Sequence, residues 1–172
     1  YKGQRGENPD PLKRQMQNIQ TLLKAVGIPV LSSAEYEADD FAGSLIKQFE
    51  GPDMPIRFLT KDRDYLQLLS EYTKGWMLLS SEAKYNDLSQ KYGYQSEDDV
   101  PFGCYEFDEN VLMGEYGLTP AQVIDWKGIS GDVSDNIPGV KGVSDKNAIP
   151  LLQKYGSLEE IYNIVDTYNT EE

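Results

Sequence analysis

The chain has 172 residues, of which 39% are hydrophobic, so it suits about one domain with a hydrophobic core. It contains no histidine, which excludes Ser-His-Asp or Cys-His catalysis and histidine metal ligands, and its single cysteine excludes an internal disulfide. The formal net charge of −13 argues against a broadly basic nucleic-acid surface. Two alternatives stay open: a merely acidic protein, or one whose acids form a metal site while local Lys and Arg bind phosphates.

The first part of the sequence predicts helices that alternate with strands. Apolar residues at 12–26 recur at helical spacing, and a second helix is expected from the first acidic cluster to Phe49. Short apolar segments at 28–31, 56–60 and 75–79 indicate strands, with a short helix between the last two. We therefore expect an α/β fold with a mainly parallel central sheet flanked by helices.

Residues 80–103 interrupt this alternation. They are rich in Tyr, Ser and acidic residues and show no clear period, which indicates an insertion or a long surface loop. The triplets Tyr-Glu-Phe at 105–107 and Val-Leu-Met at 111–113 flank Asp-Glu-Asn at 108–110, and this pattern favours a hairpin. We expect residues 1–118 together to form the α/β core.

Residues 119–172 predict a helical region. Thr119 and Pro120 are typical of the N-cap and the first helical position. Two further helices are expected at 145–155 and 157–165. A glycine-containing turn precedes them, so this region is expected to form a second, helical part of the chain.

Seven carboxylates stand in three tight clusters at the edges of apolar segments: Glu37, Asp39, Asp40, Asp62, Asp64, Asp132 and Asp135. Crowded anions repel one another unless a cation neutralises them, and oxygen ligands suit Mg²⁺ or Mn²⁺. In parallel sheets ligands bind beyond the carboxyl ends of strands, where the first two clusters are expected. Each cluster alone could equally be an acidic first turn of a helix, a cap or a turn. Their shared setting favours a divalent metal site.

A second candidate site is the turn at 139–144. Two glycines expose backbone N–H groups there, and a helix start adds positive potential, so a phosphate could dock. Lys141 and Lys146 would supply charge at the same place. The alternative is an ordinary turn between helices.

In their order along the chain, these motifs resemble the 5′-nuclease family, which includes the 5′→3′ exonuclease domain of bacterial DNA polymerase I and flap endonucleases. The motifs are Glu-Ala-Asp-Asp at 37–40, Thr-Lys-Asp-Arg-Asp-Tyr-Leu-Gln-Leu-Leu at 60–69 and Gly-Asp-Val-Ser-Asp-Asn-Ile-Pro-Gly-Val at 131–140. The opening Tyr-Lys-Gly-Gln-Arg is similar to the segment that leads into the family's helical arch. The resemblance implies a PIN-like nuclease core followed by a helix-hairpin-helix region.

The resemblance also implies two sets of metal ligands: Glu37, Asp39 and Asp40 for one ion, and Asp62, Asp64, Asp132 and Asp135 for the other. Lys2 and Arg5 match the catalytic cations at the base of the arch, which contact the scissile phosphate. The helix-hairpin-helix element binds duplex phosphates, in the family with a bridging monovalent cation such as K⁺. Its DNA-binding positions here would be Asn136, Gly139, Lys141, Gly142, Ser144 and Lys146.

The activity implied by the resemblance is hydrolysis of DNA with 5′ ends, flaps or junctions, as a 5′→3′ exonuclease or flap endonuclease using two or more Mg²⁺ or Mn²⁺ ions. The chain is expected to be a monomer without a membrane span. It is expected in a bacterial or phage-like cytoplasm, associated with the nucleoid, and to act in DNA replication and repair. The family carries two further metal-binding Asp residues before the arch, and this sequence begins after them. It also has Ser144 and Asn147 where the family favours Gly and Thr. The alternatives are therefore a non-catalytic DNA-junction binding fragment and a structural acidic domain.

Overall fold

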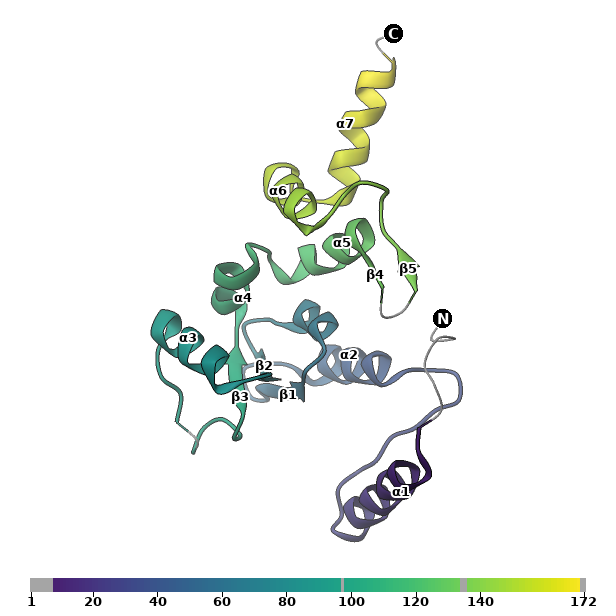
Figure 1. The fold of residues 1–172 in the computed structure, drawn as a ribbon, viewed down its shortest axis with the longest axis vertical. Helices are drawn as coiled ribbons and strands as arrows, with labels where there is room; N and C mark the ends of the chain where they lie inside the picture. The colour runs from purple at the N-terminus through teal and green to yellow at the C-terminus, as the bar shows by residue number, and fades with distance from the viewer. Residues whose placement is uncertain (1–7, 97, 134–135, 171–172) are drawn as a thin grey trace.

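The computed structural model describes residues 8–96, 98–133 and 136–170. Its helices surround a small sheet, with the helical C-terminal part on one side (Figure 1). In chain order the elements are α1 (Asp10–Ala25), α2 (Ala38–Phe49), β1 (Ile56–Thr60), the 3-10 helix η1 (Arg63–Leu68), β2 (Thr73–Leu78), α3 (Glu82–Tyr92), β3 (Cys104–Phe107), α4 (Glu109–Tyr116), α5 (Pro120–Ser130), β4 (Gly131–Asp132), β5 (Ile137–Pro138), α6 (Asp145–Tyr155) and α7 (Leu158–Thr170).

The main sheet has the order β1-β2-β3. Strands β1 and β2 are parallel, with Ile56 opposite Thr73, whereas β3 runs antiparallel to β2. A parallel pair needs a crossover connection of about a dozen residues, and η1 lies within this one. The crossover therefore begins directly beyond the carboxyl end of β1, where the second acidic cluster stands.

Most of the predicted helices are confirmed. Helices α1, α2, α5 and α6 begin and end close to the expected residues, and α7 continues to Thr170. Thr119 is the N-cap of α5: its side chain accepts a hydrogen bond from the Gln122 N–H, and the Gln122 side chain accepts one from the Thr119 N–H. This reciprocal capping satisfies N–H groups that the helix start would otherwise leave unpaired.

Three of the predicted elements are wrong. Residues 28–31 form no strand, and Ile28 and Leu31 are exposed. Residues 80–103 are not simply a loop, because they contain α3, whose first turn is capped by Ser81. Residues 111–113 belong to α4 rather than to a hairpin, because the Asp108 side chain accepts a hydrogen bond from the Val111 N–H and so caps a helix.

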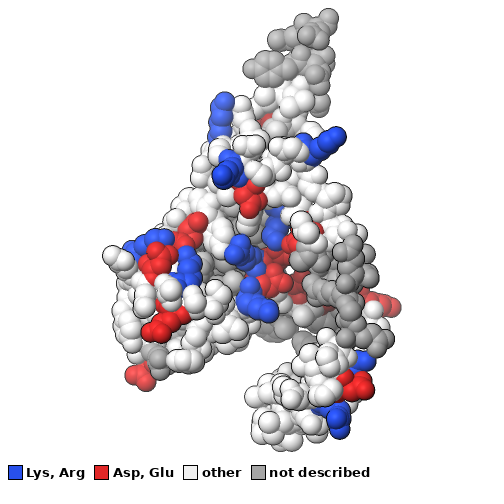
Figure 2. Space-filling view, in the orientation of Figure 1, with Lys and Arg blue, Asp and Glu red and all other residues white. Residues whose placement is uncertain are grey.

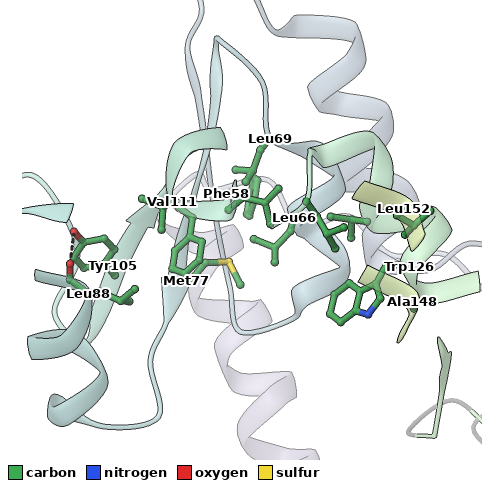
Figure 3. Close-up of a cluster of buried hydrophobic side chains, with 14 of the residues drawn as sticks. Phe58, Leu66, Leu69, Met77, Leu88, Tyr105, Val111, Trp126, Ala148 and Leu152 are labelled. Carbon is green, nitrogen blue, oxygen red and sulfur yellow. Dashed lines mark hydrogen bonds between the residues drawn. The ribbon is translucent and has the colours of Figure 1, made fainter. Parts of the chain in front are cut away.

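One cluster of buried side chains extends from the sheet to the C-terminal helices. Figure 3 shows Phe58 and Met77 from the sheet beside Leu66 of η1, with Trp126 of α5 and Leu152 of α6 further along. Because η1 packs against both the sheet and α5, its carboxylates are fixed relative to α5. This packing is what positions the site described below.

Helix α1 has apolar residues at helical spacing, yet none of its residues is buried. Leu12, Met16, Ile19 and Leu22 are each at least 42% exposed. In Figure 1 the helix lies apart from the sheet. Among the described residues, no helix is long and apolar enough to cross a membrane.

The Glu106 carboxylate on β3 joins all three strands of the sheet. It accepts hydrogen bonds from Arg57 Nε at 2.7 Å, Lys74 Nζ at 2.9 Å and Trp76 Nε1 at 3.3 Å. Partial burial raises the pKa of Glu106, but Lys74 and Arg57 more than offset this, so the pKa lies below its usual value. The ionised form is therefore the one that stabilises the fold.

Replacing Glu106 with Gln is expected to lower the free energy of unfolding by about 1–2 kcal/mol at neutral pH. The contribution of Glu106 is fully present above the ordinary carboxyl pKa and is lost as the pH falls through its lowered folded pKa, so the two proteins should converge in acid. Urea denaturation at neutral pH and in acid measures the free energy of unfolding of both proteins. The exposed residue Glu109 provides the control, Glu109→Gln. An unchanged difference in acid would contradict the prediction.

Candidate metal centre

The second acidic cluster is built by the start of η1. Asp62 is its N-cap, with Oδ1 accepting a hydrogen bond from the Asp64 N–H at 3.1 Å. The Asp62 N–H in turn donates to Thr60 Oγ1 at 3.0 Å, at the last residue of β1. Asp62 therefore does cap a helix, as the alternative to a metal site predicted. The same geometry holds both carboxylates at the carboxyl end of β1.

Asp132, from the third cluster, lies in the β4–β5 hairpin that follows α5. Asp132 pairs with Ile137 in this hairpin, and the Val140 N–H donates to the Ile129 carbonyl at 2.7 Å. Gly131 has a φ of 74° and lies tightly against Gly139. A side chain would fit at neither glycine, so the two residues let the hairpin fold back directly onto the end of α5.

Asp64 and Asp132 meet at a lysine that sequence reasoning did not identify. Lys127 Nζ lies 2.8 Å from Asp64 Oδ1 and 2.8 Å from Asp132 Oδ2. Partial burial lowers the pKa of Lys127, but the hydrogen bond to Asp132 and the negative charges of Asp132 and Asp64 more than offset it, so its pKa is raised. No sequence signal could have found this residue, because it faces Asp64 only through the packing of α5 on η1.

The first cluster stands at the start of α2. Glu37 is the N-cap, and its N–H donates to Asp40 Oδ2 at 2.9 Å, so these two residues form a capping box. Asp39 lies in the same first turn. Burial raises the pKa of Tyr65, and the negative charges of Asp39 and Asp62 raise it further. The first and second clusters therefore act on the same tyrosine, and the start of α2 faces η1.

An open hollow of about 300 Å³ lies beside the start of η1, and its lining residues are Lys61, Asp62, Arg63, Lys127 and Asp132. Figure 2 shows acidic and basic side chains gathered at the middle of this face. The carboxylates suit a hard cation, and the neighbouring Lys and Arg suit an anion such as phosphate. Groups suited to both kinds of ligand therefore line one hollow.

The carboxylates fit a divalent ion by their chemistry, but the described residues do not surround one. Asp64 Oδ1 is buried without an aligned hydrogen bond, and the ammonium of Lys127 is the cation facing it. No group of three or more acidic or cysteine side chains within the described ranges is arranged to hold a metal ion. Three predicted site residues, Lys2, Arg5 and Asp135, lie outside the described residues.

The predicted DNA-binding turn joins β5 to α6. Asn136 has a φ of 60° and Gly142 a φ of 83°, and Lys141 and Lys146 are exposed. Ser144 is the N-cap of α6 with a φ of −114°, so the position expected to favour glycine does not adopt a left-handed backbone. A side chain at Ser144 therefore meets no left-handed backbone strain.

Trp126 links this turn to the carboxylates around Lys127. Its Nε1 donates to Asp145 Oδ1 at 2.9 Å, at the start of α6. Trp126 and Lys127 are neighbours on α5, and Lys127 Nζ lies 5.8 Å from the Trp126 ring centroid. Helix α5 therefore positions both the lysine between the carboxylates and the helix that follows the turn.

Comparison with known families and proteins confirms the resemblance seen in the motifs. The family described as 5′-3′ exonuclease, N-terminal resolvase-like domain, matches residues 1–93, and its C-terminal SAM fold matches residues 118–172. DNA polymerase I of Deinococcus radiodurans is 38% identical over 94% of this chain, and that of Caldicellulosiruptor bescii is 40% identical over 96%. The chain spans only 14% and 18% of the length of these two relatives.

Solved structures share the fold at low sequence identity. The bacteriophage T5 D15 protein, co-crystallised with metal ions, matches 93% of this chain and 53% of its own, with a TM-score of 0.64 and 19% identity. The catalytic core of Rad2 in complex with a DNA substrate matches 96% of this chain and 46% of its own, with a TM-score of 0.52 and 18% identity. These similarities confirm the predicted fold class.

Proposed function

Because this chain belongs to the 5′-3′ exonuclease family, we propose that it hydrolyses phosphodiester bonds in DNA that carries 5′ ends, flaps or junctions. The observation that carries the proposal is the convergence of Asp64 and Asp132, from two separate elements, on Lys127, at a hollow that Asp62, Asp132 and basic residues line. This hydrolysis would take place in a bacterial or phage-like cytoplasm during DNA replication and repair. The chain would act as a monomer.

The carboxylates would hold divalent ions, either Mg²⁺ or Mn²⁺. Glu37, Asp39 and Asp40 would serve one ion, and Asp62, Asp64, Asp132 and Asp135 the other. Such ions, when bound, supply an activated water and stabilise the charge on the attacking and leaving oxygens. The capping bonds of Glu37 and Asp62 support this role, because they orient neighbouring carboxylates before any ion arrives. The chain has no histidine that could serve as a general base.

Basic residues would hold the phosphates of the substrate. Lys61 and Arg63 line the hollow beside the carboxylates, and we propose Lys2 and Arg5 as further cations at the scissile phosphate. The turn of Asn136, Gly139, Lys141, Gly142, Ser144 and Lys146 would bind the duplex through its backbone N–H groups, with K⁺ as a bridging ion. Binding would then depend on phosphates and junction shape rather than on base edges.

A cleavage assay with a 5′-flap duplex tests the proposal. The 172-residue chain is expected to release 5′ fragments in Mg²⁺ or Mn²⁺ and to release none when EDTA removes the divalent ion. Binding to the same duplex, measured by fluorescence anisotropy, should weaken as salt is added. Salt-sensitive binding without cleavage in either ion would favour the alternative of a DNA-junction binding fragment. Absence of both would leave a structural acidic domain.

A further inference from the structure

At the candidate metal centre, the ammonium of Lys127 contacts the carboxylates of both Asp64 and Asp132. Lys127 Nζ lies 2.8 Å from an oxygen of Asp64 and 2.8 Å from an oxygen of Asp132, as the ion pairs of a shared cation require. The three side chains are 28%, 31% and 18% exposed, so solvent screens them only partly. Lys127 therefore offsets one of the two negative charges of this pair of carboxylates.

We infer that Lys127 is a resident cation of the candidate metal centre, which a divalent ion must displace in order to bind between Asp64 and Asp132. The inference rests on the proposed function in one respect, since it takes these two residues as ligands of a divalent ion. Lys127 is then a positioning residue: it keeps the carboxylates close together without metal and sets the affinity for the ion.

Two structural observations favour displacement over a permanent ion pair. Asp64 Oδ1 is buried and has no aligned hydrogen bond, so this contact is ionic rather than directional. Lys127 also borders the open hollow that Lys61 and Arg63 line. The flexible stem of a lysine lets its ammonium leave the carboxylates for that hollow while α5 stays packed.

A lysine elsewhere in the chain provides a control for the loss of a charge. Lys84 Nζ on α3 lies 2.6 Å from Glu115 Oε2 and 3.1 Å from Asp87 Oδ2, so it too joins two carboxylates, although Lys91 also pairs with both and would remain. Its side chain is 39% exposed, and it does not line the hollow. Lys84→Met removes the same charge and a double ion pair from a site for which we propose no metal.

The test measures metal affinity by isothermal titration calorimetry with Mg²⁺ and Mn²⁺, and melting temperature with and without the ion, on the 172-residue chain. Without metal, Lys127→Met is expected to melt about 3 °C below the wild type, because two carboxylates lose their shared cation. Its metal affinity is expected to be about tenfold tighter, which corresponds to about 1.4 kcal/mol of removed competition. Saturating metal should close the difference in melting temperature.

The controls separate this from general electrostatics. Lys84→Met is also expected to melt lower, but metal should not restore it. Lys61→Met removes a charge from the rim of the same hollow and should tighten metal binding by less than Lys127→Met. Unchanged or weaker metal affinity in Lys127→Met, or equal tightening in Lys61→Met, overturns the inference.

These experiments distinguish failure of this inference from failure of the nuclease proposal. Tighter metal binding in Lys127→Met, together with no cleavage of any flap substrate, would support the resident cation and contradict the nuclease activity. Cleavage by the wild type with no tightening in Lys127→Met would do the reverse. No binding of either ion to wild type or variant would overturn the inference and the metal dependence of the proposed function together.

Discussion

Replacing Gly139 with alanine is expected to lower the free energy of unfolding by about 3 kcal/mol and to open the β4–β5 hairpin. A Cβ at this position would overlap the backbone carbonyl of Ser130 and lie 2.7 Å from the Gly131 nitrogen. Both neighbours are backbone, so no side-chain rotation can relieve the overlap. Because the same hairpin holds Asp132 beside Lys127, binding of divalent ions should weaken as well.

Urea denaturation followed by circular dichroism measures the loss of stability, and titration calorimetry measures the metal affinity. The control is Gly51→Ala, since a Cβ at Gly51 would meet no atom within 4 Å and its φ is not in the left-handed region. This variant should stay within about 0.5 kcal/mol of the wild type. A Gly139→Ala protein as stable as Gly51→Ala would show that the hairpin tolerates a side chain there.

Replacing Asp132 with Asn is expected to reduce the rate of flap cleavage by at least about 100-fold. The amide keeps the shape of the carboxylate but removes the negative charge that a divalent ion requires, and affinity for hard cations follows ligand charge. It also removes one of the two carboxylates that Lys127 contacts. DNA binding should be largely retained, because the proposed phosphate contacts come from other residues.

Single-turnover cleavage and anisotropy on the same flap duplex separate these two effects. The control is Asp53→Asn, an exposed carboxylate that does not line the hollow, and it should cleave at the wild-type rate. If Asp132→Asn cleaves as fast as Asp53→Asn, Asp132 is not a metal ligand. If it instead loses DNA binding in the same proportion as cleavage, its role is structural.

The sequence predicted elements best where local chemistry decides the structure. Thr119 and Pro120 signal a helix start through groups within four residues of each other, and the structure has that start. Apolar composition predicts a strand at 28–31, but composition cannot supply the neighbouring strand that pairing needs. Apolar composition also predicts a strand at 111–113, but the Asp108 side chain caps a helix there.

The candidate site was predictable in its carboxylates and not in its cation. Asp62 and Asp64 could be expected beyond β1 because a strand end followed by acids is visible in the sequence. Lys127 could not be expected, since its contact with Asp64 depends on how α5 packs against η1. For the first cluster the sequence allows both an acidic first turn of a helix and metal ligands; the structure has that first turn, with Glu37 and Asp40 in a capping box.

Helix α1 limits what a denaturation curve can report about this protein. None of its residues is buried, so little of its helical structure is stabilised by the core that unfolds cooperatively. At 16 residues it is close to the length at which an isolated helix is marginal in water. Substitutions on α1 can therefore change its helicity without moving the unfolding midpoint. The global free energy of unfolding therefore reports the stability of the sheet, η1, α5 and α6, and does not report the stability of α1.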